Sequence, residues 1–258
     1  MSEKQAIEIF HVSRSNGTPL FLHPFDNENK LFKVMEKERM NGLYGSEPRI
    51  ESLTLFRNEL YRMVEKEVRD WVADARFIPR FLMSAGAFLV TYLVLSFVVR
   101  DPIPILDEIA ISTGVAILAY ILLGRRDLRS EMALKKRISL RNRVDSIVFN
   151  ESDFIKRIEE YLAAAEGAGP EELAAKIARS DDRLIPEEHK ARGERIVSYL
   201  GRRFDKREMR RLEKRILKGE EGTEKTLKRL AEQNKLDLPL FGLYLQLKRD
   251  VRRDAAAR

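Results

Sequence analysis

The residues best suited to chemistry in this sequence are its three histidines, since the chain contains no cysteine. His11 and His23 fall in a stretch predicted to form a β-hairpin, with Asp26 close behind them, and such side chains can bind a metal ion. Three ligands of unknown orientation are a weak pattern, and surface histidines are far commoner, so we predict no metal site. His189 begins a helix and lacks the HExxH spacing that places two imidazoles on one metal.

The sequence does not indicate a nucleotide-binding loop either. The segment GEEGTEK at 219–225 resembles a phosphate loop only faintly, because it lacks the Gly-x4-Gly-Lys-Ser/Thr order and a preceding strand. The chain also lacks the glycine fingerprint of dinucleotide-binding proteins. We therefore expect no catalytic residues, no cofactor and no enzymatic activity.

Asp107 and Glu108 form an acidic pair at the start of an apolar segment. In a homo-oligomer this pair would repeat around an axis as an acidic ring, which is how some cation-selective pores are built. Acidic side chains at a helix N-terminus are also favoured by the helix dipole, which is the simpler explanation. A cation channel with a ring of Asp107 and Glu108 is therefore kept as the alternative function.

A basic stretch within 202–218 could bind an anionic partner. Asp205, Glu208 and Glu213 lie at spacings that offset part of this charge along a helix. A solvated helix face is therefore the first interpretation, and contact with anionic lipid is the second. We do not expect nucleic acid as a partner, because no aromatic side chains alternate with the basic ones. The basic residues are Arg202, Arg203, Arg207, Arg210, Arg211, Lys214 and Arg215.

These candidate residues flank a central apolar region. Residues 81–99 contain no charged side chain, and a bilayer core needs roughly 20 such residues in a helix. Residues 105–123 reach a similar length when the acidic pair lies at the interface, and the connector is too short for a domain. A soluble helical core is the alternative, but such a helix keeps a polar stripe for water, which 81–99 lacks. The sequence predicts a transmembrane helical hairpin.

The distribution of charge predicts the orientation of this hairpin. The 48 Lys and Arg exceed the 41 Asp and Glu, and the excess lies mostly after residue 123. Basic residues near membrane helices stay in the cytoplasm, so we expect a multi-pass protein of the cytoplasmic membrane with both termini cytoplasmic. The basic residues after the second span should also attract anionic lipid headgroups. They are Arg125, Arg126, Arg129, Lys135, Lys136 and Arg137.

Small residues in the second span predict contact with another helix. Ala110 and Gly114 lie one turn apart and allow close approach, either within the hairpin or between copies of the chain. Apart from the acidic pair, the only ionisable side chains in the spans are tyrosines, which argues against a transport path within one chain. We therefore expect a homo-oligomer or a complex with another membrane protein.

The polar arms predict a fold class that is mainly α. Residues 1–47 are predicted to form a small α+β unit, and 48–80 a long amphipathic helix that leads to the membrane. A basic juxtamembrane helix at 124–150 then precedes a basic all-helical cytoplasmic domain at 151–258. The finer predictions are a β-hairpin at 6–23, a helix at 29–41, a turn at 42–48 and one long helix at 186–218.

These patterns together predict an integral membrane protein with two transmembrane helices. Since no catalytic constellation accompanies them, we expect a non-enzymatic anchor or scaffold for protein interaction at the cytoplasmic membrane face. The N-terminal residues contain no apolar h-region, so we expect no cleaved signal peptide.

Overall fold

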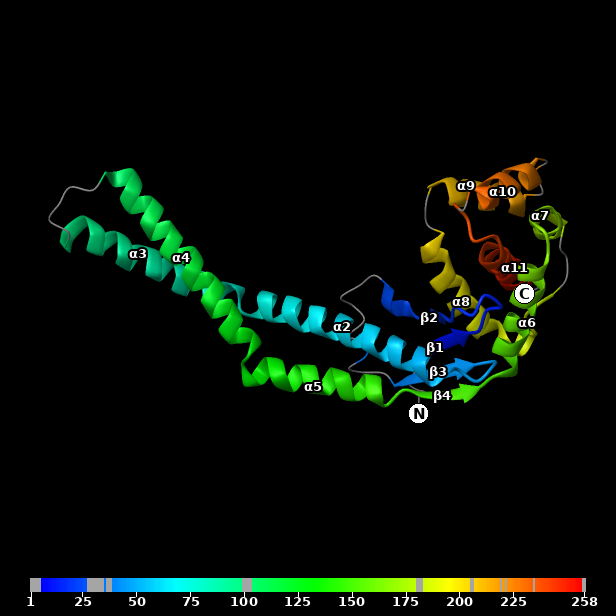
Figure 1. Cartoon of the computed structure of the whole chain (residues 1–258), viewed down its shortest axis with the longest axis horizontal. Helices are drawn as coiled ribbons and strands as arrows, with labels where there is room; N and C mark the ends of the chain where they lie inside the picture. The colour runs from blue at the N-terminus through cyan, green and yellow to red at the C-terminus, as the bar shows by residue number, and fades with distance from the viewer. Residues whose placement is uncertain are drawn as a thin grey trace. The chain divides into compact units, whose positions relative to one another are not determined.

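The computed structural model is mainly helical, with a small four-stranded sheet (Figure 1). It describes residues 6–26, 35, 39–98, 104–179, 183–204, 207–218, 220, 222–233 and 235–256. The chain divides into two compact units. Unit 1 comprises the described residues within 1–31, 37–56 and 147–258, and unit 2 those within 32–36 and 57–146.

The sheet of unit 1 has the strand order β2-β1-β3-β4. The predicted hairpin is confirmed, because β1 (Ile7–Val12) pairs antiparallel with β2 (Leu20–Leu22). The connecting loop turns at Gly17, whose φ of +74° suits glycine. Strands β3 (Met40–Tyr44) and β4 (Val148–Glu151) extend the sheet in parallel.

Strand β3 corrects two predictions. The helix predicted at 29–41 lies largely outside the described residues, but its end is strand, as is the start of the turn predicted at 42–48. Glycine makes this stretch unlike a strand in sequence. In the structure Gly42 lies opposite Phe149 of β4, and an added Cβ atom would lie 2.3 Å from that ring. The ring therefore occupies the space that a side chain on β3 would need.

One face of the sheet packs against the C-terminal helices. Its side chains share a continuous core with α6 (Asp153–Gly167), α8 (Lys190–Arg203) and α11 (Leu238–Ala256). The residues that β1, β2 and β3 contribute to this core are Phe10, Val12, Leu20, Leu22 and Leu43. The shorter elements of unit 1 are η1 (Pro24–Asp26), α7 (Pro170–Arg179), η2 (Glu187–His189), α9 (Arg207–Leu217) and α10 (Thr223–Glu232).

Ion pairs also join the N-terminal strands to the C-terminal part of unit 1. In the β1–β2 loop, Arg14 donates to Glu166 at 2.5 Å and to Asp237 at 2.6 Å. On β1, the Glu8 carboxylate lies 3.1 Å from Arg192 and 2.9 Å from Arg195 of α8. The regions predicted as separate units at 1–47 and 151–258 thus fold together in unit 1, because each supplies one side of a common core.

The long helix predicted at 186–218 is interrupted. Helix α8 ends at Arg203, and α9 begins at Arg207. Between them Phe204 is buried, with its ring centroid 5.1 Å from that of Phe241 in α11. Apolar residues at helical spacing occur on both sides of this break, which is why the sequence pattern does not reveal it.

The opposite face of the sheet carries an aromatic cluster. The ring of Phe21 stacks on Phe56, the last residue of α2 that belongs to unit 1, at 4.2 Å between centroids. His11 lies edge-on to Phe21 at 4.9 Å and is only 2 % exposed. Neither ring nitrogen of His11 has a hydrogen-bond partner among the described residues, and burial lowers its pKa to about 4.

His11 should therefore make unit 1 sensitive to acid. In the unfolded chain its pKa returns to about 6.5, so the unfolded state binds the proton first as the pH falls. Between pH 7 and pH 5 we expect a loss of about 2 kcal/mol in the free energy of unfolding. His11→Phe should remove this part of the pH dependence, measured by hydrogen exchange of the β1 amides at several pH values. An unchanged pH profile in His11→Phe would contradict the assignment.

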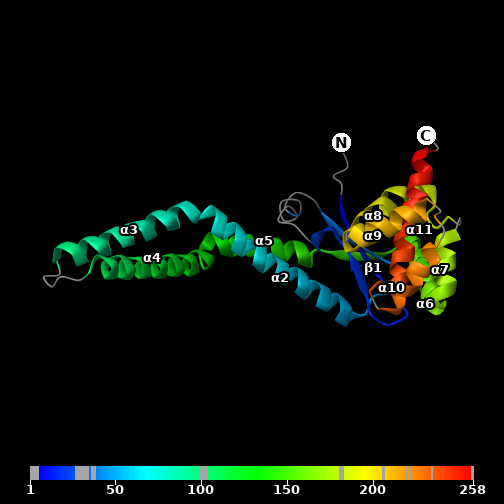
Figure 2. The ribbon, with the colours of Figure 1, turned by 90° about the horizontal axis from the view of Figure 1, so that it is seen from above.

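In the described part of 57–146, unit 2 consists of helices in two antiparallel pairs (Figures 1 and 2). They are α2 (Ile50–Ala75), α3 (Phe77–Val98), α4 (Ile105–Leu128) and α5 (Glu131–Asp145). The predicted stripe of α2 is largely confirmed, since Leu60, Val64 and Val68 are buried, with Val72 next. The break between α2 and α3 falls at Arg76, near Pro79. Proline has no backbone N–H and so cannot donate a hydrogen bond to the preceding turn.

Helices α3 and α4 are long and apolar enough to cross a membrane, over Phe77–Phe97 and Ile105–Leu128. They contact each other, and Ser84 of α3 donates to the backbone oxygen of Ala116 in α4 at 2.6 Å. Only 6 % and 11 % of the residues in their most apolar stretches are buried, and many of their large apolar side chains are exposed. This exposure differs from that of a helix in a soluble core.

Both apolar helices lie in the chain segment that connects two neighbouring parallel strands of the sheet, β3 and β4. Strand β3 precedes α2, and β4 follows α5, yet the two strands are neighbours with Tyr44 opposite Glu151. The basic helix predicted at 124–150 accordingly ends with strand residues that complete the sheet. Unit 1 is therefore assembled from sequence on both sides of the apolar segment.

Candidate anion-binding site

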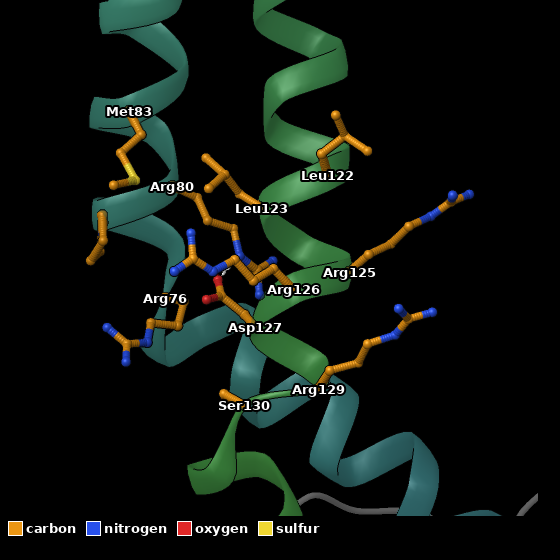
Figure 3. A pocket seen from close by; sticks show the side chains of 11 residues that line it. Arg76, Arg80, Met83, Leu122, Leu123, Arg125, Arg126, Asp127, Arg129 and Ser130 are labelled. Atoms are coloured by element: carbon orange, nitrogen blue, oxygen red, sulfur yellow. Dashed lines mark hydrogen bonds and ion pairs between the residues drawn. The ribbon is translucent and has the colours of Figure 1, made fainter.

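A basic cavity lies in unit 2 where the apolar stretches of α3 and α4 end (Figure 3). Its volume is about 900 Å³, within the range of small-ligand sites. The helices position it because α4 ends at Leu128, and Ser130 then caps α5 by accepting from the backbone nitrogen of Ala133 at 3.4 Å. The lining residues are Arg76, Pro79, Arg80, Met83, Leu122, Leu123, Arg125, Arg126, Asp127, Arg129 and Ser130.

An ion pair between α3 and α4 forms the centre of the cavity wall. Arg80 donates from Nε to the Asp127 carboxylate at 2.7 Å, and Figure 3 shows the two side chains between the helices. Arg80 is buried, and its guanidinium also lies 3.4 Å from the backbone oxygen of Val72. The guanidinium also packs close to Gly124, where an added Cβ would lie 3.4 Å from it, an ordinary contact distance. Asp127 thus neutralises Arg80.

The remaining guanidiniums of the lining are exposed. Arg129, the C-cap residue of α4, lies one turn after Arg125, and the two side chains extend on the same side of the helix (Figure 3). Within the part of the chain that the structure describes, no carboxylate pairs with either of them, or with Arg76 or Arg126. Arg125 and Arg129 also line a neighbouring hollow of about 570 Å³ with Arg137. The cavity therefore has a net positive charge that a bound anion could neutralise.

The basic residues predicted to contact lipid divide into two groups. Arg125, Arg126 and Arg129 line the cavity, as described above. In α5, by contrast, Lys135 pairs with Glu131 at 2.6 Å, and Lys136 lies over the Trp71 ring at 5.2 Å. Arg137 lies 2.9 Å from Glu65 and so helps to hold α5 against α2.

The sequence patterns do not single out Arg76 and Arg80 as site residues. Arg76 and Arg80 are four residues apart in sequence, and so are Arg125 and Arg129. This spacing is the signal that could have placed each pair on one side of its helix. Predicting the site would also have required knowing that α3 packs against α4, because this packing brings the two sets of arginines to one cavity.

The acidic pair is divided between two environments. Asp107 is exposed, whereas Glu108 is 8 % exposed and accepts from Ser96 of α3 at 2.7 Å. Glu108 therefore faces α3 of its own chain. Ala110 and Gly114 are exposed, and no described atom of another element lies within 4 Å of a Cβ added at Gly114, so their role in helix contact stays a prediction.

The basic stretch predicted as an anionic-partner face spans the end of α8 and all of α9. Arg202 donates to the backbone oxygen of Pro24 at 2.7 Å, and Arg215 lies 3.1 Å from Glu220. Arg211 and Arg215 line a hollow of about 620 Å³ with residues of α10. The others are exposed on the surface of unit 1, namely Arg203, Arg207, Arg210 and Lys214.

The histidines are not assembled into a metal-binding group. His11 and His23 are both buried in the aromatic cluster, and the backbone nitrogen of Phe25 donates to His23 Nδ1 at 3.1 Å. His189 packs against Phe154 at 5.2 Å between ring centroids. Among the described residues, no three histidine, aspartate or glutamate side chains are grouped so that they could hold a metal ion.

The geometry therefore points to the arginine-lined cavity as the candidate site. Comparison of the chain with protein-family models, with curated proteins and with solved structures gives no match.

Proposed function

We propose that this chain is an integral membrane protein in which α3 and α4 cross the bilayer as a hairpin. The supporting observation is the exposure of apolar side chains around α3 and α4. Leu89, Val90, Leu93 and Val94 are each about half exposed, and burial of such side chains in hydrocarbon is strongly favourable. A lipid bilayer provides that environment around the whole helix pair.

The sheet of unit 1 supports an even number of crossings. Because β3 and β4 hydrogen-bond to each other, they must lie on the same side of a membrane. The chain between them then crosses twice or not at all. Arg76, Arg125 and Arg129 at the near ends of the helices favour the cytoplasmic side for unit 1, which puts both termini in the cytoplasm.

The proposed role is that of a non-enzymatic anchor or scaffold that presents unit 1 to protein partners. Buried or half-buried charged groups of unit 1 join helices and strands to one another, as Arg14 does with Glu166 and Asp237. In the same way, Lys248 of α11 lies 2.6 Å from Glu213 of α9. Contact between copies through the exposed Ala110 and Gly114 is part of this proposal.

Membrane integration can be tested in the native chain. The protein should stay in the pellet when vesicles are washed with alkaline carbonate, because burial of two apolar helices is effectively irreversible. Release of the protein together with a peripheral control would contradict the proposal.

Orientation can be tested with single cysteines, since the chain has none of its own. An impermeant maleimide should label Pro104→Cys, which is exposed immediately before α4, on intact cells. Ser15→Cys and Glu172→Cys, exposed on either side of the apolar segment in sequence, should react only after permeabilisation. Labelling of Ser15→Cys and Glu172→Cys on intact cells would reverse the orientation, and labelling of one alone would contradict the hairpin.

A further inference from the structure

We propose that the arginine-lined cavity binds the phosphate headgroup of an anionic glycerophospholipid, as a discrete site and not by diffuse attraction. The inference rests on the proposed function, because the cavity meets lipid only if α3 and α4 lie in a bilayer. It extends that function by naming a ligand class and the side chains that bind it.

The cations of the cavity have the geometry for phosphate. Arg125 and Arg129 lie one turn apart and extend in one direction, so their planar guanidiniums can donate to the same phosphate oxygens (Figure 3). Arg126 and Arg76 add positive charge from α4 and from the turn before α3. Of the described lining residues only Asp127 is acidic, and it is already paired with Arg80.

The apolar part of the lining favours a lipid over a free phosphate ion. Met83, Leu122 and Leu123 line the same cavity on the side of the spans (Figure 3). A phospholipid at the interface would place its headgroup among the arginines and the beginning of its acyl chains against these three side chains. Inorganic phosphate would use only the cationic half, so its affinity should be much lower.

Binding can be measured by native mass spectrometry of the full-length protein in detergent micelles. The probes are dioleoylphosphatidylglycerol, dioleoylphosphatidylcholine and inorganic phosphate. We expect one phosphatidylglycerol per chain at saturation, weaker retention of phosphatidylcholine, and no competition from millimolar phosphate. The triple variant Arg125→Gln, Arg126→Gln and Arg129→Gln should weaken phosphatidylglycerol binding by about 100-fold.

Two control variants separate a site from diffuse charge. Replacing the same three arginines by lysine keeps the charge but removes the planar fork, so a site predicts about tenfold weaker binding. Replacing the exposed Arg203, Arg207 and Lys214 of unit 1 by glutamine removes equal charge elsewhere and should leave retention unchanged. Trp71 fluorescence, from the single tryptophan, verifies that unit 2 of each variant is folded.

Three results would overturn the inference. They are equal retention of both lipids, unchanged binding in the glutamine triple variant, and displacement of lipid by millimolar inorganic phosphate, which would make the cavity a soluble-anion site. Because binding is measured in micelles, it is independent of the carbonate test. A protein that resists carbonate but fails these measurements keeps its anchor role and loses only the lipid site.

Discussion

A fragment of residues 147–258, expressed alone, is expected not to fold. It contains the C-terminal helices but lacks β1, β2 and β3, which cover the inner side of α6, α8 and α11. Five core side chains are lost with these strands: Phe10, Val12, Leu20, Leu22 and Leu43. At roughly 2 kcal/mol for each buried apolar side chain, the loss is on the order of 10 kcal/mol, comparable with the whole stability of a domain.

The matched control restores the strands without the membrane part. Residues 1–56 joined to 147–258 through a flexible linker of about 12 residues should fold as a soluble domain, since a parallel crossover needs about that length. The linker has a short distance to span, because the rings of Phe56 and Phe149 are 6.4 Å apart. Limited proteolysis and circular dichroism would compare the two proteins. A protease-resistant fragment 147–258 would contradict the shared core.

The sequence predicts the individual elements better than their assembly. The hairpin of β1 and β2 has local signals, alternating apolar residues and Asn16–Gly17 at the turn, and its pairing is confirmed. Apolar periodicity likewise predicts α2 and the helices after residue 150. Local patterns cannot show that β3 pairs with β4, which lies across the whole of α2 to α5 in sequence. Gly42, required by the close approach of Phe149, further disguises β3 as a turn.

The candidate site was likewise predictable from the sequence only in part. Charge near the apolar helices is visible in sequence, and it identifies Arg125, Arg126 and Arg129. The pairing of Lys135 and Lys136 with groups on α5 and α2 is not visible, so sequence alone treats all basic residues after the second span as equivalent. The structure distinguishes them, because it shows which cations already have partners.

Asp127→Ala should destabilise unit 2 by about 4 kcal/mol, because it leaves the buried Arg80 guanidinium without its carboxylate. The side chains of Arg80 and Asp127 are only 9 % and 23 % exposed, so water can replace the lost partner only in part. Unfolding by sodium dodecyl sulfate in mixed micelles, followed by Trp71 fluorescence, measures this loss in the unit that contains the pair.

Two further variants identify the cause of that loss. Asp107→Ala removes an exposed acid from the first turn of the same helix and should cost less than about 1 kcal/mol. The double variant Arg80→Met and Asp127→Leu removes both charges and should recover most of the stability, since an apolar pair needs no compensation. If Asp127→Ala instead behaves like Asp107→Ala, the Arg80 guanidinium is hydrated from the cavity. The pair would then contribute little to the packing of α3 on α4.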